Sequence, residues 1–316
     1  MGNWLDRCRK LLLRLLLRAL LKPLWRRLAG PEGIRRLRAH AARADRWVGG
    51  GRDAAVQSVQ LEGVAGCWIG DAAAAQHGVL LYLHGGGFCV HMPATYRALG
   101  AALQQRTGLR VLLPDYRLAP EHPYPAGLDD VERVYTALLA NAVADGPAEG
   151  LDPRRCCIAG DSAGGALALA LLQRLRDRGL PLPACAVLLS PVTDLCGGSP
   201  SWQRNERSDW MFTLAAQPLL CEAYAPGRDL ADPGLSPLLG HWHGLPPLAF
   251  HVSSSEMLLD DSVRAVERAR AAGVAAELRI WPDLPHVFQV ALSLRDAQRS
   301  LDEIGHFIAR HLKASP

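Results

Sequence analysis

The sequence lacks the cysteine patterns that mark metal sites and disulfide-stabilised folds. Its eight cysteines include no Cys-x-x-Cys pair, and no zinc-type spacing of histidines accompanies them. Several cysteines lie inside apolar runs, which favours reduced, buried thiols in a cytoplasmic protein. His241 and His243 could suggest a metal, but no third ligand is evident. We therefore expect no metal and a cytoplasmic location.

The N-terminal segment lacks an uncharged run long enough for a signal peptide or a membrane span. Between residues 4 and 28 a charged residue interrupts the leucines at least every fourth position, and no small-residue cleavage site follows. On a helical wheel two opposite arcs emerge, a basic one of Arg7, Lys10, Arg14, Arg18 and Lys22, and an apolar one of Leu12, Leu13, Leu16, Leu17 and Leu20. This pattern predicts an amphipathic basic helix with a bend at Pro23. We favour a lid, while a subunit contact and peripheral contact of residues 4–28 with an anionic membrane stay open.

Positive charge is confined to this N-terminal segment. Residues 1–52 hold 14 Lys/Arg and 3 Asp/Glu, whereas the remainder of the chain holds 21 and 28. Because the rest of the chain is acidic, we expect no nucleic-acid partner. The three glycines at 49–51 are interpreted as a linker, which divides the chain into N-terminal cap helices at 1–50 and a larger domain at 51–316.

Beyond residue 55, short apolar runs alternate with helical patterns. After a hairpin at 56–69, the pattern predicts strands at 78–83, 109–113, 156–159, 185–189, 248–252 and 277–281. It predicts helices at 94–105, 128–143, 166–175, 261–272 and 293–312. Such alternation is typical of an α/β fold, with a mostly parallel sheet covered by helices on both faces. Residues from about 196 to 235 break the rhythm, include a helical stretch at 214–224, and are interpreted as a cap insert.

A strand-to-helix junction carries the candidate nucleophile. The apolar run ending at Gly160 is followed by Asp161, Ser162, Ala163 and Gly164, and then by a leucine- and alanine-rich stretch. Gly-x-Ser-x-Gly at such a junction is typical of a nucleophile elbow, in which small neighbours allow a strained serine to project from the sheet. The start of the following helix also favours developing negative charge.

A serine nucleophile needs a base and an acid that orients the base. His286 is the best placed histidine, because it lies in the loop between the last predicted strand and the last helix. The acid should follow the preceding strand, where Glu256 comes first and Asp260 and Asp261 come next. We favour Glu256, with Asp260 as the alternative and Asp283 as a minor rival. Asp260 and Asp261 are also explained as residues that cap the helix they begin and complement its dipole.

Donors for an oxyanion are predicted in the run His84, Gly85, Gly86 and Gly87. This run ends the strand that should neighbour the elbow, and glycines let backbone N–H groups approach a substrate without obstruction by a Cβ atom. The amide of Ala163 should converge on the same place.

Seven segments together resemble the hormone-sensitive-lipase-like group of α/β-hydrolases. They are HGGGF at 84–88, DYRLAPEHPYPA at 115–126, GDSAGG at 160–165, SPLL at 236–239, LPP at 245–247, EMLLDD at 256–261 and LPHVF at 284–288. The resemblance implies an α/β-hydrolase fold, a helical cap, and carboxylesterase activity on short- to medium-chain esters without a cofactor. It also implies that the amides of Gly86, Gly87 and Ala163 form the oxyanion hole, and that edge strands can pair into a homodimer.

The acid motif departs from the family's common pattern. Many members have Asp-Pro-Leu-x-Asp, whereas this chain has Glu256 and no proline in that stretch. The form resembles a subset of acetyl-ester and lactone hydrolases, so a lactone hydrolase or an acetyl-ester hydrolase with the same residues is the alternative. A non-catalytic ligand receptor on the same fold is a remote alternative, because the chain has a candidate at every catalytic position.

Overall fold

The computed structural model describes residues 2–48, 55–140 and 151–312, and the predicted linker at 49–51 lies outside them. One eight-stranded sheet lies at the centre of the described residues, in the order β1-β2-β4-β3-β5-β6-β7-β8. The strands are β1 (Val56–Leu61), β2 (Val64–Ile69), β3 (Val79–Leu83), β4 (Arg110–Pro114), β5 (Cys156–Asp161), β6 (Cys185–Leu189), β7 (Leu248–Ser253) and β8 (Ala276–Trp281). β2 pairs antiparallel with β1 and β4, and the remaining neighbours pair in parallel. The predicted α/β fold with a mostly parallel sheet is confirmed.

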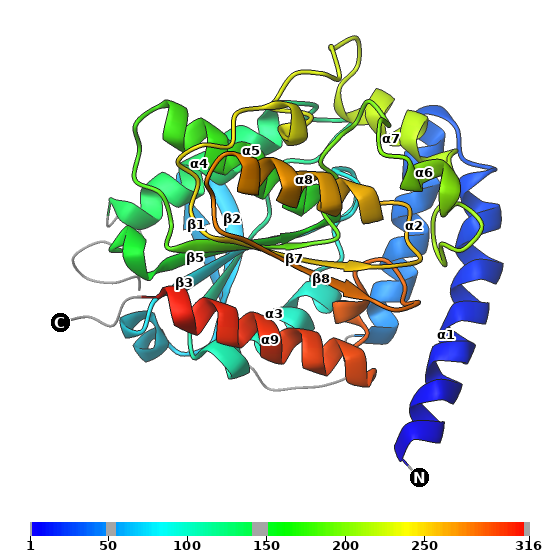
Figure 1. Ribbon diagram of the computed structural model, residues 1–316, viewed down its shortest axis with the longest axis horizontal. Helices are drawn as coiled ribbons and strands as arrows, with labels where there is room; N and C mark the ends of the chain where they lie inside the picture. Colours follow the sequence, from blue (N-terminus) through cyan, green and yellow to red (C-terminus); the bar gives the residue numbers. More distant parts are fainter. Residues whose placement is uncertain (1, 49–54, 141–150, 313–316) are drawn as a thin grey trace.

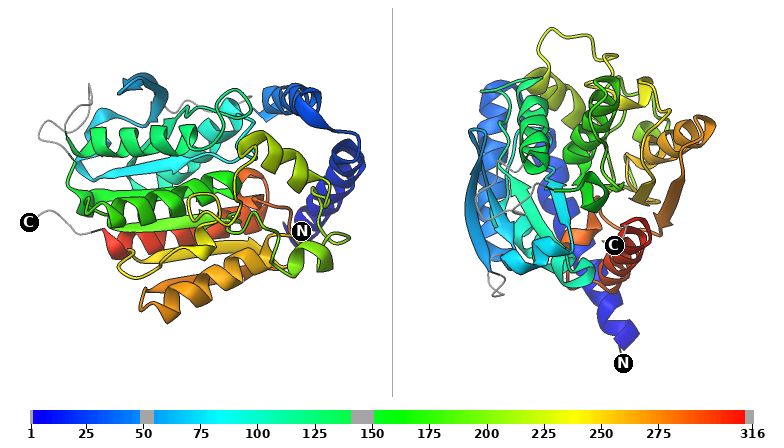
Figure 2. Two further views of the ribbon diagram at one scale, coloured as in Figure 1. Left: turned by 90° about the horizontal axis from the view of Figure 1, so that it is seen from above. Right: turned by 90° about the vertical axis from the view of Figure 1, so that its left-hand side faces the viewer.

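Helices cover both faces of this sheet (Figures 1 and 2). α3 (Pro93–Thr107) and α9 (Arg295–His311) lie on one face, while α4 (Ala126–Leu139), α5 (Ser162–Asp177) and α8 (Leu259–Ala271) lie on the other. Four further helices gather beyond the carboxyl ends of the parallel strands, namely α1 (Gly2–Trp25), α2 (Gly30–Val48), α6 (Ser201–Arg204) and α7 (Ala216–Tyr224). Segments from the N-terminus and from the 196–235 insert therefore meet at one edge of the sheet.

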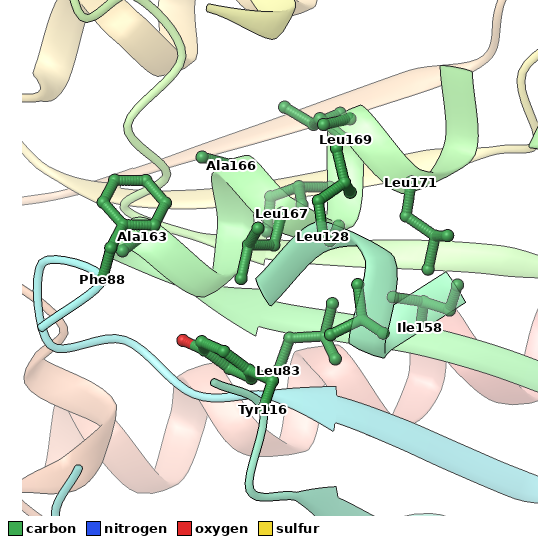
Figure 3. Packing of buried hydrophobic residues seen from close by; sticks show 14 of the residues in the cluster. Leu83, Phe88, Tyr116, Leu128, Ile158, Ala163, Ala166, Leu167, Leu169 and Leu171 are labelled. Carbon is green, nitrogen blue, oxygen red and sulfur yellow. The ribbon is translucent and has the colours of Figure 1, made fainter. Parts of the chain in front are cut away.

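The central strands of the sheet are buried on both faces because two apolar cores enclose them. In β3, Leu81 and Leu83 contribute to the core under α4, α5 and α8, whereas Leu80 and Tyr82 contribute to the core under α3 and α9. Figure 3 shows the first core, to which Leu83 of β3, Ile158 of β5 and Leu167 of α5 contribute. Every residue of β3 to β7 is buried, so neither face of these inner strands needs polar residues, which explains why such strands were recognisable as apolar runs, whereas the outer strands β1 and β8 are largely exposed.

Several predicted boundaries need correction. Helix α4 ends at Leu139, before the predicted end at 143, and residues 141–143 lie outside the described residues. Helix α5 begins at the elbow residue Ser162, four residues earlier than predicted. At the N-terminus, α1 ends at Trp25, with Pro23 inside its last turn, and a second helix begins at Gly30.

The N-terminal helices are anchored to the edge where the candidate site residues lie. Trp25 and Ile34 are buried in the main core, and α2 packs against α3 and α7. Arg38 of α2 donates hydrogen bonds of 2.7 Å to the carbonyls of Cys89 and Ala119. Cys89 lies just after the predicted oxyanion loop, so α2 braces that loop directly.

Candidate active site

Ser162 stands at a sharp turn between β5 and α5. Its backbone adopts φ = 52°, in the left-handed region that side chains other than glycine rarely occupy. Tight packing enforces this turn, since a Cβ atom on Gly160 would overlap the Gly164 carbonyl and one on Gly164 would overlap the Leu83 carbonyl. The strained geometry predicted from Gly-x-Ser-x-Gly is therefore present. The Ser162 side chain lies at the N-terminus of a 16-residue helix, where the helix dipole favours negative charge.

The glycine run after β3 lies beside the elbow, because Leu83 pairs with Gly160 in the sheet. Gly86 adopts φ = 111°, and a Cβ atom there would overlap the Val90 carbonyl, so this turn requires glycine. Among the described residues, the amides of Gly86, Gly87 and Ala163 have no hydrogen-bond partner. Ala163 lies in the first turn of α5, where backbone N–H groups lack an acceptor within the helix. Three free donors at this edge could bind an oxyanion.

A buried carboxylate holds the glycine loop in place. The Gly85 amide donates to Asp161 Oδ1 at 2.9 Å, and the hydroxyls of Tyr82 and Tyr96 donate to the same carboxyl at 2.9 and 3.0 Å. Burial raises the pKa of Asp161 to about 6, although these donors and the His286 charge oppose the shift. Asp161 thus ties the elbow to the loop after β3.

His84 is buried at the start of the same glycine loop. Its ring stacks between His91 and Tyr116, with centroid distances of 4.3 Å to each, and its Nδ1 lies 2.7 Å from the Gly85 carbonyl. Burial, together with the neighbouring His91, lowers the pKa of His84 to about 3. The ring is therefore neutral near pH 7, which suits a packing residue that shapes the loop.

His286 and Glu256 are in contact at the same edge of the sheet. His286 Nδ1 lies 3.2 Å from Glu256 Oε2, which also accepts a 3.0 Å hydrogen bond from the Ser190 hydroxyl. Both side chains of the pair are buried. The other nitrogen of His286, Nε2, is buried and has no hydrogen-bond partner in the described part of the chain. An imidazole fixed through Nδ1 with a free Nε2 has the geometry that a general base requires.

The protonation of this pair follows from its surroundings. Burial lowers the pKa of His286, but the hydrogen bond and charge of Glu256, together with the charges of Asp209 and Asp161, outweigh burial and raise the pKa above its ordinary 6.5. Burial raises the pKa of the Glu256 carboxyl, against the effects of its hydrogen bonds with His286 and Ser190.

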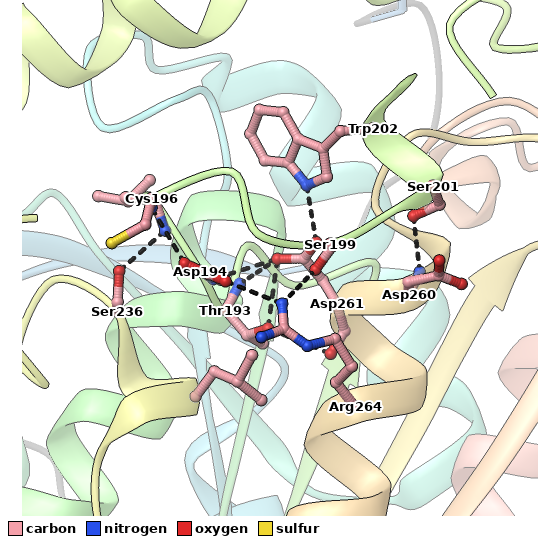
Figure 4. Close-up of polar contacts among 12 residues, drawn as sticks. Thr193, Asp194, Cys196, Ser199, Ser201, Trp202, Ser236, Asp260, Asp261 and Arg264 are labelled. Carbon is pink, nitrogen blue, oxygen red and sulfur yellow. Dashed lines mark hydrogen bonds and ion pairs between the residues drawn. The ribbon is translucent and has the colours of Figure 1, made fainter. Parts of the chain in front are cut away.

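The rival acids have other partners. Asp261 is buried and accepts from the amides of Thr193 and Asp194 at 2.9 and 3.1 Å and from Trp202 Nε1 at 2.8 Å (Figure 4). Asp260 forms a 2.9 Å ion pair with Arg204.

Of the two roles that the sequence suggested for Asp260 and Asp261, capping of the helix is wrong, whereas complementation of the helix dipole agrees with their place in the first turn of α8. Both lie inside the first turn of α8, and no side chain caps that helix. Asp283, the third rival, accepts from Trp210 Nε1 at 3.0 Å and from Arg14 at 2.7 Å.

Several residues that support the site escaped the sequence analysis. Ser190 follows β6 directly, and this polar position at the carboxyl edge of the sheet was the signal that could have identified it. Phe212 packs edge-on against the His286 ring at 5.0 Å and touches Trp25 of α1 at 5.4 Å. Leu220 of α7 lies over Gly87, where an added Cβ atom would meet its δ carbons.

The described residues contain no group of three His, Cys, Asp or Glu side chains placed to hold a metal ion. The side chains and backbone amides described above bring reactive groups of their own to this edge of the sheet. A strained hydroxyl, a fixed imidazole and free amides together suit acyl transfer.

Comparisons with known proteins place the chain in a family. Residues 80–290 match the model of a family described as having the alpha/beta hydrolase fold. An acetyl-hydrolase of Streptomyces hygroscopicus is 38% identical over 231 residues, covering 72% of this chain and 74% of its own length. An esterase of Acinetobacter venetianus is 35% identical over 258 residues, covering 80% and 81%.

Solved structures indicate the same family. A hormone-sensitive lipase from a metagenome library superposes with a TM-score of 0.84 at 34% identity, covering 95% of this chain and 98% of its own. The chain therefore belongs to the alpha/beta hydrolase family and, within it, to the hormone-sensitive-lipase-like group of esterases.

Proposed function

We propose that the chain hydrolyses carboxylic esters with short to medium acyl chains through an acyl-enzyme intermediate. The observation that carries this proposal is the chain of hydrogen bonds from Ser190 through Glu256 to His286, which leaves Nε2 of His286 without a partner among the described residues. The names of the relatives, acetyl-hydrolase and esterase, support the same class of substrate.

In this mechanism His286 Nε2 takes the proton from Ser162 as the serine oxygen bonds to the ester carbonyl carbon. The amides of Gly86, Gly87 and Ala163 hold the resulting oxyanion, and each such donor typically contributes about 3 kcal/mol of transition-state stabilisation. The protonated imidazole then gives its proton to the departing alcohol oxygen as the carbon–oxygen bond breaks. Water attacks the acyl-enzyme with the same base, and Ser162 is regenerated. Glu256 keeps the His286 proton on Nδ1 and balances the imidazolium charge.

We also propose that the helices of residues 1–50 and the insert at about 196–235 form a cap over this site. The insert supports it through the contacts of Phe212 with His286 and of Leu220 with Gly87, and the N-terminal helices join the insert through the contact of Trp25 with Phe212. A cytoplasmic location and a homodimer stay predictions.

A substrate panel tests the proposed activity. p-Nitrophenyl esters from acetate to palmitate should show the highest kcat/KM at short and medium chains, with a steep fall toward palmitate. Several lactones belong in the same panel, and faster turnover of lactones than of esters would assign the alternative function. Absence of turnover on every ester and lactone would contradict the proposal.

The insert should set the upper limit of acyl length. Leu220→Ala removes the branched side chain over Gly87, so the ratio of kcat/KM for octanoate to acetate should rise about tenfold, as expected for a few methylene groups in an apolar pocket. Leu214→Ala is the matched control, because the same truncation falls on an exposed side chain of the same insert. An unchanged ratio in Leu220→Ala would place the acyl chain elsewhere.

Activity should fall in acid with a midpoint above pH 6.5. The base must be neutral, and the raised pKa of His286 means that protonation begins to remove the active form at a higher pH than for an ordinary histidine. The midpoint is read from kcat/KM against pH. Asp260→Asn should leave it unchanged, because that charge is not among the main ones acting on His286. A wild-type midpoint at or below 6.5 would contradict the proposed environment.

A further inference from the structure

Helix α1 presents its apolar side to solvent. Eleven large hydrophobic side chains are exposed in the described residues, and seven of them lie on this one helix, namely Trp4, Leu5, Leu11, Leu12, Leu15, Leu16 and Leu20. Their spacing of three and four residues places them in one stripe, about 24 Å long at the rise of an α-helix. Exposed Cys8 and Ala19 continue the stripe between them. A surface helix normally turns such a stripe toward the core.

The polar side of α1 attaches it to the body of the protein. Arg14 forms a 2.7 Å ion pair with Asp283, Lys10 pairs with Asp296, and Lys22 donates to the Glu206 carbonyl. Asp6, the one acidic residue of α1, is buried and accepts a 3.0 Å hydrogen bond from the Arg295 amide. These contacts fix the rotation of the helix, so the apolar stripe is left for a partner outside the chain. Figure 1 and the right-hand view of Figure 2 show the N-terminal end of α1 projecting beyond the rest of the fold.

Exposed charge around this stripe is positive. Arg7 and Arg9 lie exposed near the start of α1, and Arg26 and Arg27 lie exposed just after its end. The acids of both N-terminal helices are withdrawn from solvent or paired: Asp6 and Asp45 are buried, and Glu32 accepts hydrogen bonds from Arg35 and Arg36. The complementary partner is therefore apolar and anionic.

A second copy of the chain does not meet that description. Two α1 helices packed through the stripe would bring their exposed arginines together, within a segment that already holds 14 basic and 3 acidic residues. Like charges in such a contact oppose association. A bilayer containing anionic lipid offers acyl chains for the leucines and Trp4 together with phosphate groups for the arginines.

We propose that the exposed stripe of α1 binds the surface of an anionic lipid membrane, with the helix axis in the plane of the surface. No helix of the described residues is long and apolar enough to cross a membrane, so the contact is with the interface. α1 ends at Trp25, which touches Phe212 beside His286, so the bound surface lies next to the cap of the candidate active site. The membrane contact does not depend on the proposed hydrolytic activity.

Flotation of the full-length chain with lipid vesicles tests this proposal. Binding should be strong to phosphatidylcholine vesicles that contain about one-third phosphatidylglycerol, weak without the anionic lipid, and reduced by salt, which screens surface charge. The double variant Leu12→Glu, Leu16→Glu should bind at least about tenfold more weakly, because it places two carboxylates in the stripe. Its matched control is Val56→Glu, Leu239→Glu, which changes the net charge equally at exposed apolar residues outside α1 and should bind as wild type does.

The neutral pair Leu12→Gln, Leu16→Gln separates lost apolar contact from added negative charge, and it should also bind more weakly than wild type. Circular dichroism melting confirms that each variant is folded. Three results would overturn the proposal: no binding of wild type to anionic vesicles, equal binding of wild type and the folded Leu12/Leu16 variants, or a wild-type dimer in sedimentation velocity that those variants convert to a monomer. The last result would assign the stripe to a second copy of the chain.

Discussion

Replacing Ser162 by alanine should lower kcat for p-nitrophenyl butyrate by about 10⁴-fold or more, the loss typical of removing a serine nucleophile. The fold should survive, because the change removes only one oxygen atom at the start of α5. The left-handed backbone at this residue is enforced by the packing of Gly160 and Gly164, which the substitution does not touch.

A matched control removes the same atom from a buried serine outside the site. Ser300 on α9 hydrogen bonds with His251 at 2.8 Å, and Ser300→Ala should leave kcat within about twofold while it lowers the free energy of unfolding by about 1 kcal/mol. Hydrolysis that persists in a folded Ser162→Ala protein would mean that another group attacks the ester.

The second large effect concerns the acid. Glu256→Gln should reduce kcat by about 10² to 10⁴-fold, because an amide cannot fix the His286 proton on Nδ1 or balance the imidazolium charge. The same variant should move the acid midpoint of kcat/KM to lower pH, since the Glu256 charge is one cause of the raised pKa of His286. Steady-state kinetics across the pH range measure both changes.

Asp260→Asn provides the contrast for this prediction. The substitution removes the ion pair between Asp260, which is mostly buried, and Arg204, which is exposed. We therefore expect a loss of stability of about 1 kcal/mol or less and near-normal kcat. The reverse outcome, with normal turnover in Glu256→Gln and a collapse in Asp260→Asn, would transfer the orienting role to Asp260.

Local patterns predicted the sheet and the turns around the candidate site because their causes are local. Strands buried on both faces need apolar residues at every position, and the turn at Ser162 needs small residues within two positions. Both requirements concern residues that are adjacent in the sequence. The order of the chain then indicated His286 and Glu256, since the carboxyl ends of parallel strands meet at one edge.

Contacts between distant segments could not be predicted in the same way. Ser190 donates a hydrogen bond to Glu256, which lies 66 residues further along the sequence, and Phe212 contacts His286 from the insert. No local sequence pattern therefore indicates either contact. Helix α1 illustrates another limit. Its two arcs were evident on the helical wheel, but the direction of each arc depends on acceptors such as Asp283 and Asp296, which lie more than 250 positions away.

Covalent trapping of the nucleophile is the most direct test of the proposed mechanism. A p-nitrophenyl alkylphosphonate should react with one hydroxyl per chain, forming a phosphorus–oxygen bond and releasing one equivalent of p-nitrophenolate. Peptide mass spectrometry should then find the added phosphonyl mass on Ser162 alone, with hydrolysis lost in proportion to labelling. A label on another residue, or full ester hydrolysis by a chain that is stoichiometrically labelled at Ser162, would contradict the account.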